Sequence, residues 1–211
     1  MINRILIYFF VFIFSSFLCL GQKIDTIINK VIYKSYYSIS LKTPLYVEYD
    51  LFNGGGSISR KQFYFKKEAL TLNDQSYKSI NKGLIKYDRG HLANAEDFAF
   101  DYYKEKLTFS YYNCLPQTRK LNRGIWKIWE TAIRNQSRKW PLRIYCGGIF
   151  EYPSLNSIAI PSYCWKVVIN LKTHSIMHVL LFKNDNSGLV QRINISELKK
   201  ILNYDFIINY Y

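Results

Sequence analysis

Two motifs within residues 88–130 carry the side chains with the clearest chemical potential. The first is Asp88-Arg-Gly-His91, and the second runs from Asn113 through Asn122 to Glu130. Hydrolysis of a phosphodiester needs a base that deprotonates water, cations that stabilise the charged transition state, and a proton or metal ion for the leaving oxygen. The imidazole, guanidinium groups, amides and carboxylate of these motifs suit that reaction with the help of one divalent cation.

His91 is the candidate base, because a neutral imidazole accepts a proton from water near pH 7. Gly90 permits a tight backbone turn where a strand would end. Arg89 offers a forked, permanently charged donor to phosphate oxygens. Each residue also has a structural alternative: a core or surface histidine, and an arginine paired with Asp88 or Asp97. These residues alone leave the choice open.

Asn122, Glu130 and Arg134 form the second group of candidates. Glu130 and Arg134 are four residues apart, so their side chains can touch on one helix face. An ordinary exposed ion pair is the structural alternative for them. Asn122 and Glu130 would lie about 12 Å apart along a regular helix. We therefore expect Asn122 to bind an ion directly and Glu130 to hold its water ligands, an arrangement that suits Mg²⁺, with Mn²⁺ as a second candidate.

The composition favours one domain with a polyanionic partner. The chain has 211 residues, of which 49% are hydrophobic, and a formal net charge of +14. A positive surface attracts nucleic acids, although an AT-rich coding sequence also enriches lysine without selection for function. The candidate phosphate-binding residues, whose alternative is a solvated basic face, are Lys66, Lys67, Arg119, Lys120, Arg123 and Lys127.

Residues 1–21 have the layout of a secretory signal peptide. Arg4 precedes a nearly unbroken apolar run from Ile5 to Leu20, and Gly21 offers a cleavage point before Gln22. An uncleaved anchor is the rival interpretation, but the run is short for a membrane-spanning helix. We expect a secreted or periplasmic product consisting of a single domain, residues 22–211, without stable membrane association.

Three cysteines remain after removal of that segment: Cys114, Cys146 and Cys164. An oxidising compartment would allow one disulfide and one free thiol. Cys146 and Cys164 occur in two strand-like runs that could pair, so they are the expected bridge. A bridge that includes Cys114 stays open as the alternative.

The hydrophobic pattern predicts an α+β fold with a mainly antiparallel sheet. Strands are expected at 45–51, 84–87, 107–112, 142–150, 158–160, 164–171 and 178–182, with further strand-like sequence at 24–41. A helix is expected from Asn122 to a point before Pro141, and a short one at 196–202. The order strand, Asp-Arg-Gly-His, strand, helix within residues 84–140 predicts a ββα finger that carries the candidate site.

The motifs at 88–97 and 113–130 resemble those of the DNA/RNA non-specific endonucleases, the ββα-metal nucleases. The matching pattern in the second stretch is Asn-x-x-Pro-Gln-x-x-x-x-Asn-x-Gly-x-Trp-x-x-x-Glu, and fainter likeness extends over roughly residues 44–207. Cys114 and Cys146 depart from the residues usual at their positions, which puts the disulfide pattern and substrate preference in doubt more than the catalytic set.

The resemblance implies a role for each matching residue. His91 would be the general base, and Asn122 the sole direct protein ligand of Mg²⁺. Glu130 would hold the water ligands of the ion. The other implied roles are contact with the phosphate by Arg89 and Arg134, and support of the site near His91 by Asn113.

The sequence therefore predicts an exported, Mg²⁺-dependent endonuclease that acts on DNA and RNA and leaves 5′-phosphate ends. Two rivals remain. One is a secreted, basic nucleic-acid-binding protein that lacks turnover, although the intact His91, Asn122 and Glu130 argue against it. The other is a surface protein tethered by residues 1–21.

Overall fold

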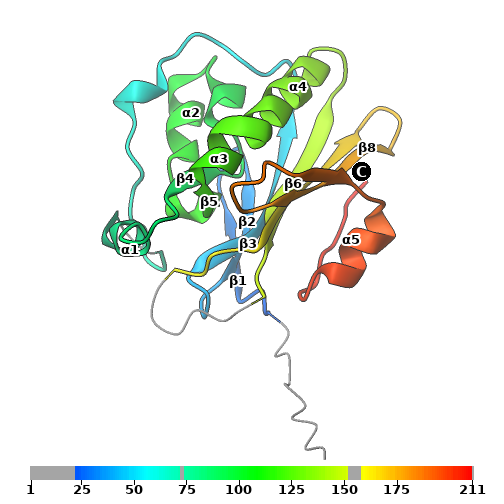
Figure 1. Ribbon diagram of the computed structural model, residues 1–211. Coiled ribbons are helices and arrows are strands. Elements are labelled where there is room, and N and C mark those ends of the chain that lie inside the picture. The colour runs from blue at the N-terminus through cyan, green and yellow to red at the C-terminus, as the bar shows by residue number, and fades with distance from the viewer. Residues whose placement is uncertain (1–21, 72–73, 152–157, 211) are drawn as a thin grey trace, which may run out of the picture.

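The computed structural model describes residues 22–71, 74–151 and 158–210 (Figure 1). Within these ranges the largest element is a seven-stranded sheet in the order β1-β2-β3-β6-β7-β8-β9. All of its neighbouring strands are antiparallel. A second, two-stranded sheet consists of β4 and β5. This arrangement of helices with mainly antiparallel strands confirms the predicted α+β class.

The strands of the large sheet follow hydrophobic runs in the sequence. Tyr163–Asn170 is buried at every position after its first residue, as expected for a central strand covered on both faces. The strands are β1 (Thr26–Asn29), β2 (Lys34–Ser38), β3 (Thr43–Leu51), β6 (Leu142–Ile149), β7 (Tyr163–Asn170), β8 (Ser175–Lys183) and β9 (Val190–Arg192). The strand expected at 158–160 is not formed in the described part of the chain.

Helices flank the sheet. The elements β4, β5, α2, α3 and α4 gather on one side, and α5 lies apart from them (Figure 1). The α-helices are α1 (Asp74–Ile80), α2 (Tyr102–Thr108), α3 (Arg119–Leu121), α4 (Lys127–Ser137) and α5 (Ile195–Ile201). Short helical turns are η1 (Arg60–Gln62), η2 (Ala95–Phe98), η3 (Tyr111–Asn113) and η4 (Asn122–Trp126). Across the described residues, no helix is both long and apolar enough to span a membrane.

The ββα finger is present, but its strands lie later in the sequence than predicted. β4 is Tyr87–His91, so the Asp-Arg-Gly-His motif is itself a strand, and it pairs with β5, Cys114–Thr118. Leu84, expected in the first strand, is fully exposed. Residues 107–112 instead end α2 and form η3. The Asp101 side chain accepts the backbone N–H groups that begin α2, and Ser110 does the same for η3.

Gly90 is needed for close packing rather than for a turn. A Cβ atom at this position would lie 2.0 Å from Oε1 of Gln117, a residue of the paired strand β5. Only glycine leaves room for that side chain, so the expectation of a turn at Gly90 was wrong.

The helix after β5 is broken at Gly124, so Asn122 lies ahead of the regular helix that carries Glu130. Gly124 has φ −104° and ψ −114°, outside the helical region, within the π-helical turn η4. A regular helix begins only at Lys127 and ends at Ser137, before Pro141. Trp126, Ile133 and Ser137 are buried, whereas Ile128 is 62% exposed.

The three cysteines within the described residues are buried and form no disulfide, so the expected Cys146–Cys164 bridge was wrong. The register of β6 and β7 places Cys146 opposite Lys166 and Cys164 opposite Gly148, so the two thiols do not face each other. Burial raises the pKa of both thiols to about 12. Such thiols stay protonated and unreactive near neutral pH.

Candidate active site

His91 ends β4 and is enclosed by aromatic rings. Its imidazole lies 4.8 Å, between ring centroids, from both Phe65 and Phe109, and the residue is only 5% exposed. Nε2 has no hydrogen-bond partner within the described part of the chain. Burial, reinforced by the charges of Arg60 and Arg89, holds the pKa of His91 well below its usual 6.5. His91 is therefore a neutral imidazole with an available lone pair.

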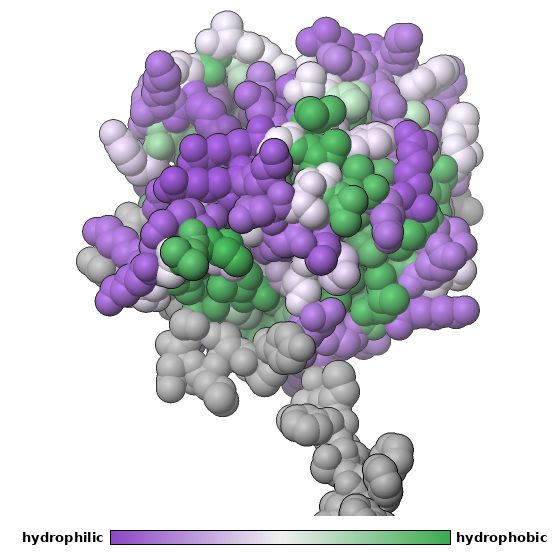
Figure 2. Space-filling model, in the orientation of Figure 1, coloured by the Kyte–Doolittle hydropathy of each residue, from purple (hydrophilic) through white to green (hydrophobic). Residues whose placement is uncertain are grey.

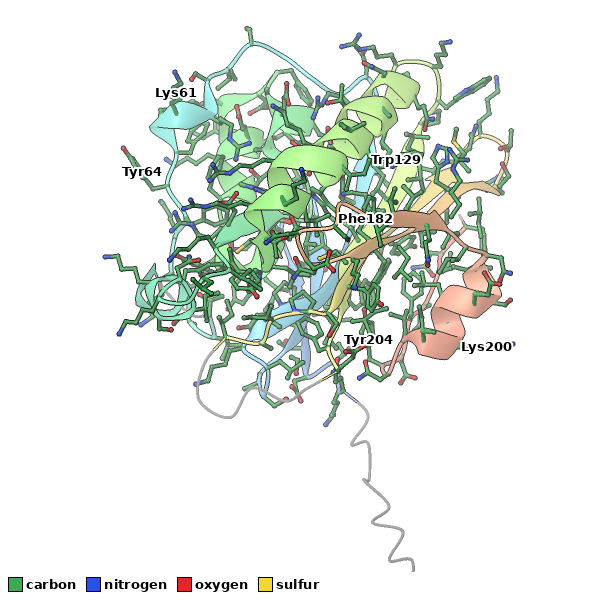
Figure 3. All side chains as sticks on the ribbon, in the orientation of Figure 1. Lys61, Tyr64, Trp129, Phe182, Lys200 and Tyr204 are labelled. Carbon is green, nitrogen blue, oxygen red and sulfur yellow. The ribbon has the colours of Figure 1, made fainter. Side chains whose placement is uncertain are left out.

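Two guanidinium groups lie against the rings that enclose His91. Arg89 is 5.4 Å from the Phe65 ring and Arg60 is 5.8 Å from the Phe109 ring. Figure 3 labels Lys61 and Tyr64 on the segment that carries Arg60 and Phe65. Arg89 was predicted from the motif, whereas Arg60 was not, because it lies far from the motif in sequence and has no local signal. Together the two arginines provide positive charge beside the candidate base.

The aromatic rings around His91 should keep its pKa low by excluding water from the imidazole. Phe65→Ala removes one of the two rings and exposes the imidazole to water, so the pKa of His91 should rise toward 6.5. Because the base acts when neutral, the acidic limb of the rate profile should move to higher pH. A pH profile of kcat/KM measures this shift, since its acidic limb reports the base of the free enzyme.

Phe63→Ala is the matched control for that experiment. Phe63 belongs to the same segment and contacts Phe109 and Tyr102. An identical acidic limb in the wild type and in Phe65→Ala would show that the ring of Phe65 does not govern the protonation of His91.

Asn113 braces the chain directly after His91. Its side-chain amide donates to the backbone carbonyls of Ala93 and Thr108, at 2.9 Å each, and accepts the Ala93 N–H at 2.8 Å. Asn113 is fully buried. These contacts agree with the predicted supporting role, in which Asn113 fixes the backbone that positions the imidazole.

The carboxylate of Asp88 orients the side chain of Asn122. Its Nδ2 donates to Oδ2 of Asp88 at 3.0 Å, and Arg123 donates to both Asp88 oxygens at 2.7 and 2.8 Å. Burial alone would raise the pKa of Asp88, but the hydrogen bonds from Arg123 and Asn122 lower it overall. With its nitrogen held by Asp88, Asn122 can present its amide oxygen to a cation.

Glu130 lies on α4 in a half-buried position. Burial raises the pKa of its carboxyl to about 7, against the opposing effects of Lys166 and a hydrogen bond from the Asn94 amide. Lys166 is buried, with Nζ 3.8 Å from the centre of the Trp126 ring. Asn94 and Lys166 were not predicted as site residues, because they act on Glu130 from other parts of the chain.

Arg134 pairs with residues outside its own helix. Its Nε donates to Oδ1 of Asp97 at 2.8 Å, and Nη1 lies 3.2 Å from Glu96. Asp97 also accepts the Tyr49 hydroxyl at 3.0 Å. The exposed Glu130–Arg134 pair considered for this helix is thus replaced by a buried pair with Asp97. The phosphate contact expected of Arg134 stays a prediction.

The donor set fits a cation that needs few protein ligands. Among the described residues, no three His, Cys, Asp or Glu side chains converge as a metal site. The donors assigned to the ion are the amide oxygen of Asn122 and the carboxylate of Glu130, both hard oxygen ligands. Mg²⁺ prefers oxygen and retains several waters, so this set is compatible with Mg²⁺ or Mn²⁺ and lacks the soft ligands typical of zinc sites.

The six predicted phosphate-binding residues are all exposed. Lys66 and Lys67 follow Phe65, and the others lie on α3, η4 and the start of α4, where Figure 2 shows a hydrophilic surface. Arg123 pairs with Asp88, and Arg119 lies 3.7 Å from the same carboxylate. Their contact with nucleic acid stays a prediction, and so does that of Lys120 and Lys127.

Comparison with known proteins agrees with this geometry. The family model of the DNA/RNA non-specific endonucleases matches residues 14–208. The chain belongs to this family. A nuclease of Nostoc sp. (strain PCC 7120 / SAG 25.82 / UTEX 2576) is 27% identical over 140 residues, which are 58% of this chain and 51% of that protein. The chain thus spans about half the length of this curated relative.

The fold of this family member also matches a solved structure. A chain in the crystal structure of the EndoG/EndoGI complex superposes with a TM-score of 0.71 at 19% identity, covering 85% of this chain and 84% of that one. The predicted family and the ββα-metal fold are both confirmed.

Proposed function

We propose that this protein is an exported, Mg²⁺-dependent endonuclease that hydrolyses phosphodiester bonds of both DNA and RNA. The observation that carries the proposal is the ββα finger, in which β4 ends in a neutral His91 with an unpartnered Nε2 while Asp88 of the same strand orients Asn122. Membership of the DNA/RNA non-specific endonuclease family supports the same reaction.

His91 performs the proton transfer. Its Nε2 accepts a proton from the attacking water, and the depressed pKa keeps this atom unprotonated at neutral and mildly acidic pH. Asn113 fixes the backbone beyond His91 and so limits its displacement. The guanidinium groups of Arg60 and Arg89 stabilise the negative charge that develops on the phosphate.

Asn122 and Glu130 hold the cation, Asn122 directly and Glu130 through water. When bound, Mg²⁺ supplies electrostatic stabilisation of the phosphate and of the leaving oxygen. Asp88 and Asn94 act through these two residues, since each makes a hydrogen bond to one of them. Departure of the 3′ oxygen leaves 5′-phosphate ends.

Specificity for sequence or sugar is expected to be weak. The charged groups of the site and the exposed Lys66, Lys67, Lys120 and Lys127 suit contact with phosphates, which are common to DNA and RNA.

Export is supported by the sequence of residues 1–21, which lie outside the described residues. The positive start and apolar run suit a signal peptide that delivers a secreted or periplasmic enzyme. Burial of the thiols of Cys114, Cys146 and Cys164 would protect them from oxidation there.

Metal removal tests the proposal. The purified protein should cleave supercoiled plasmid DNA and a structured RNA in Mg²⁺, and neither in EDTA, because the phosphate charge then lacks its main counter-ion. Restoring Mg²⁺ after EDTA should restore both activities. The alternative function is that of a nucleic-acid-binding protein without turnover, and the enclosure of His91 by Phe65 and Phe109 favours it. DNA that is retarded on the gel but stays intact would support this alternative.

A further inference from the structure

A pocket of about 420 Å³ lies between α2 and residues 66–68. None of the catalytic or metal-binding side chains lines it. The polar side chains that line it are mainly basic, and the other side chains are largely aromatic or aliphatic. This composition differs from that of a site that binds only phosphate. The principal lining residues are Lys30, Lys66, Lys67, Lys106, Tyr103 and Phe109.

A row of aromatic contacts joins this pocket to the candidate base. Phe109 lines the pocket and also contacts His91, with 4.8 Å between ring centroids. From Phe109 the row continues to Phe63 at 5.3 Å, then to Tyr102 at 5.0 Å, and finally to Tyr103 at 5.4 Å. The pocket is therefore next to the site of the reaction, on the side of α2.

Tyr103 presents its ring to solvent at the pocket. The residue is 76% exposed and is the second residue of α2, two positions after the N-cap Asp101. Lys106 and Leu107 lie three and four residues later on the same helix face and also line the pocket. An exposed ring on a helix can stack on a nucleobase whatever the sequence, because every base has an aromatic face.

The charges of the pocket favour a polyanion. Its one carboxylate, Glu68, is paired with Lys30 and accepts the hydroxyl of Ser110. Lys66, Lys67 and Lys106 are exposed, so the pocket retains an excess of positive charge around the aromatic wall.

We propose that this pocket is a subsite for an unpaired nucleotide of the substrate, next to the phosphodiester that is cleaved. Tyr103 stacks on the base, and the lysines contact the flanking phosphates. The inference rests on the proposed function, which it deepens by assigning a single-stranded segment of DNA or RNA to the α2 side of the site. A base within a duplex is stacked on its neighbours and cannot offer its face to Tyr103.

Binding without turnover tests the subsite. In EDTA, Tyr103→Ala should weaken binding of a fluorescein-labelled single-stranded DNA about tenfold, the scale of one base–aromatic stack. Tyr103→Phe should bind like the wild type, because it keeps the ring. Binding of a duplex of the same sequence should change little in either variant. Fluorescence anisotropy measures the binding of each DNA by the wild type and both variants. Because Tyr103 is highly exposed, both variants should fold like the wild type, which thermal melting checks.

Salt dependence tests the lysines separately. Lys106→Ala should reduce the slope of log K against log salt by about 0.7 for the single strand. Lys200→Ala is the matched control, since Lys200 is an exposed lysine in the last turn of α5, remote from the pocket (Figure 3).

Hydrolysis of a small activated diester, bis(p-nitrophenyl) phosphate, separates this inference from the proposed function, because this compound carries neither a nucleobase nor the flanking phosphates that the pocket would bind. Hydrolysis at equal rates by the wild type and Tyr103→Ala, with weaker single-strand binding by the variant, supports the subsite. Equal rates with unchanged single-strand binding overturn the subsite and leave the nuclease standing. If the wild type cleaves neither this compound nor plasmid DNA in Mg²⁺, the proposed function itself fails.

Discussion

His91→Ala should slow plasmid cleavage by about 10²- to 10⁴-fold, the usual contribution of a positioned general base. The variant loses the Nε2 atom that accepts the proton from water, while Arg60, Arg89 and the metal-binding residues remain. DNA binding should therefore change little. Initial rates in saturating Mg²⁺ and a gel-shift titration measure the two properties separately.

His178→Ala is the matched control for the loss of a histidine. His178 lies on β8, where its ring hydrogen-bonds the side chain of Gln136 and contacts Trp129. This variant should retain cleavage. A His91→Ala variant that cleaves within a few-fold of the wild-type rate would remove His91 from the chemistry.

Arg134→Met should destabilise the protein by about 3–5 kcal/mol, because it leaves the buried Asp97 carboxylate without its cation. Asp97 is 1% exposed and would keep the hydrogen bond from the Tyr49 hydroxyl and the more distant charge of Lys166. Urea unfolding measures the loss. Arg138→Met, at an exposed arginine just beyond α4, is the control and should change stability by much less.

The loss of stability in Arg134→Met should depend on pH in a definite direction. Burial already raises the pKa of Asp97 in the folded protein, and Arg134 opposes that rise. Without Arg134 the folded-state pKa should rise further, so protonation stabilises the folded state and the deficit should shrink as the pH falls. A deficit that stays constant from neutral to acidic pH would contradict the buried-pair assignment. Cleavage measured well below the melting temperature would then show whether Arg134 also contacts phosphate.

The chemistry of the site was more predictable than its geometry. His91, Asn122 and Glu130 stood out because their types and spacing form a motif, whereas the helix expected from Asn122 onward is broken at Gly124. The partners of these residues could not be predicted in the same way. Arg60 reaches His91 through Phe109, a contact made only by the folded chain.

Predictions from local sequence were wrong where contacts between distant parts of the chain determine the structure. The four-residue spacing of Glu130 and Arg134 suggested a pair, but Asp97 offers Arg134 a buried carboxylate from another element. Gly90 suggested a turn, whereas the side chain of Gln117 explains the glycine. Hydrophobic residues at 107–112 suggested a strand, but the caps by Asp101 and Ser110 favour helical turns.

One gel tests the central claim most directly: supercoiled plasmid incubated with wild-type protein in Mg²⁺, with wild-type protein in EDTA, and with His91→Ala in Mg²⁺. A nuclease that uses His91 and a divalent cation should convert the plasmid to nicked and linear forms only in the first lane. Equal cleavage in all three lanes, or intact plasmid in every lane, would contradict the claim that the protein cleaves DNA with His91 and a divalent cation.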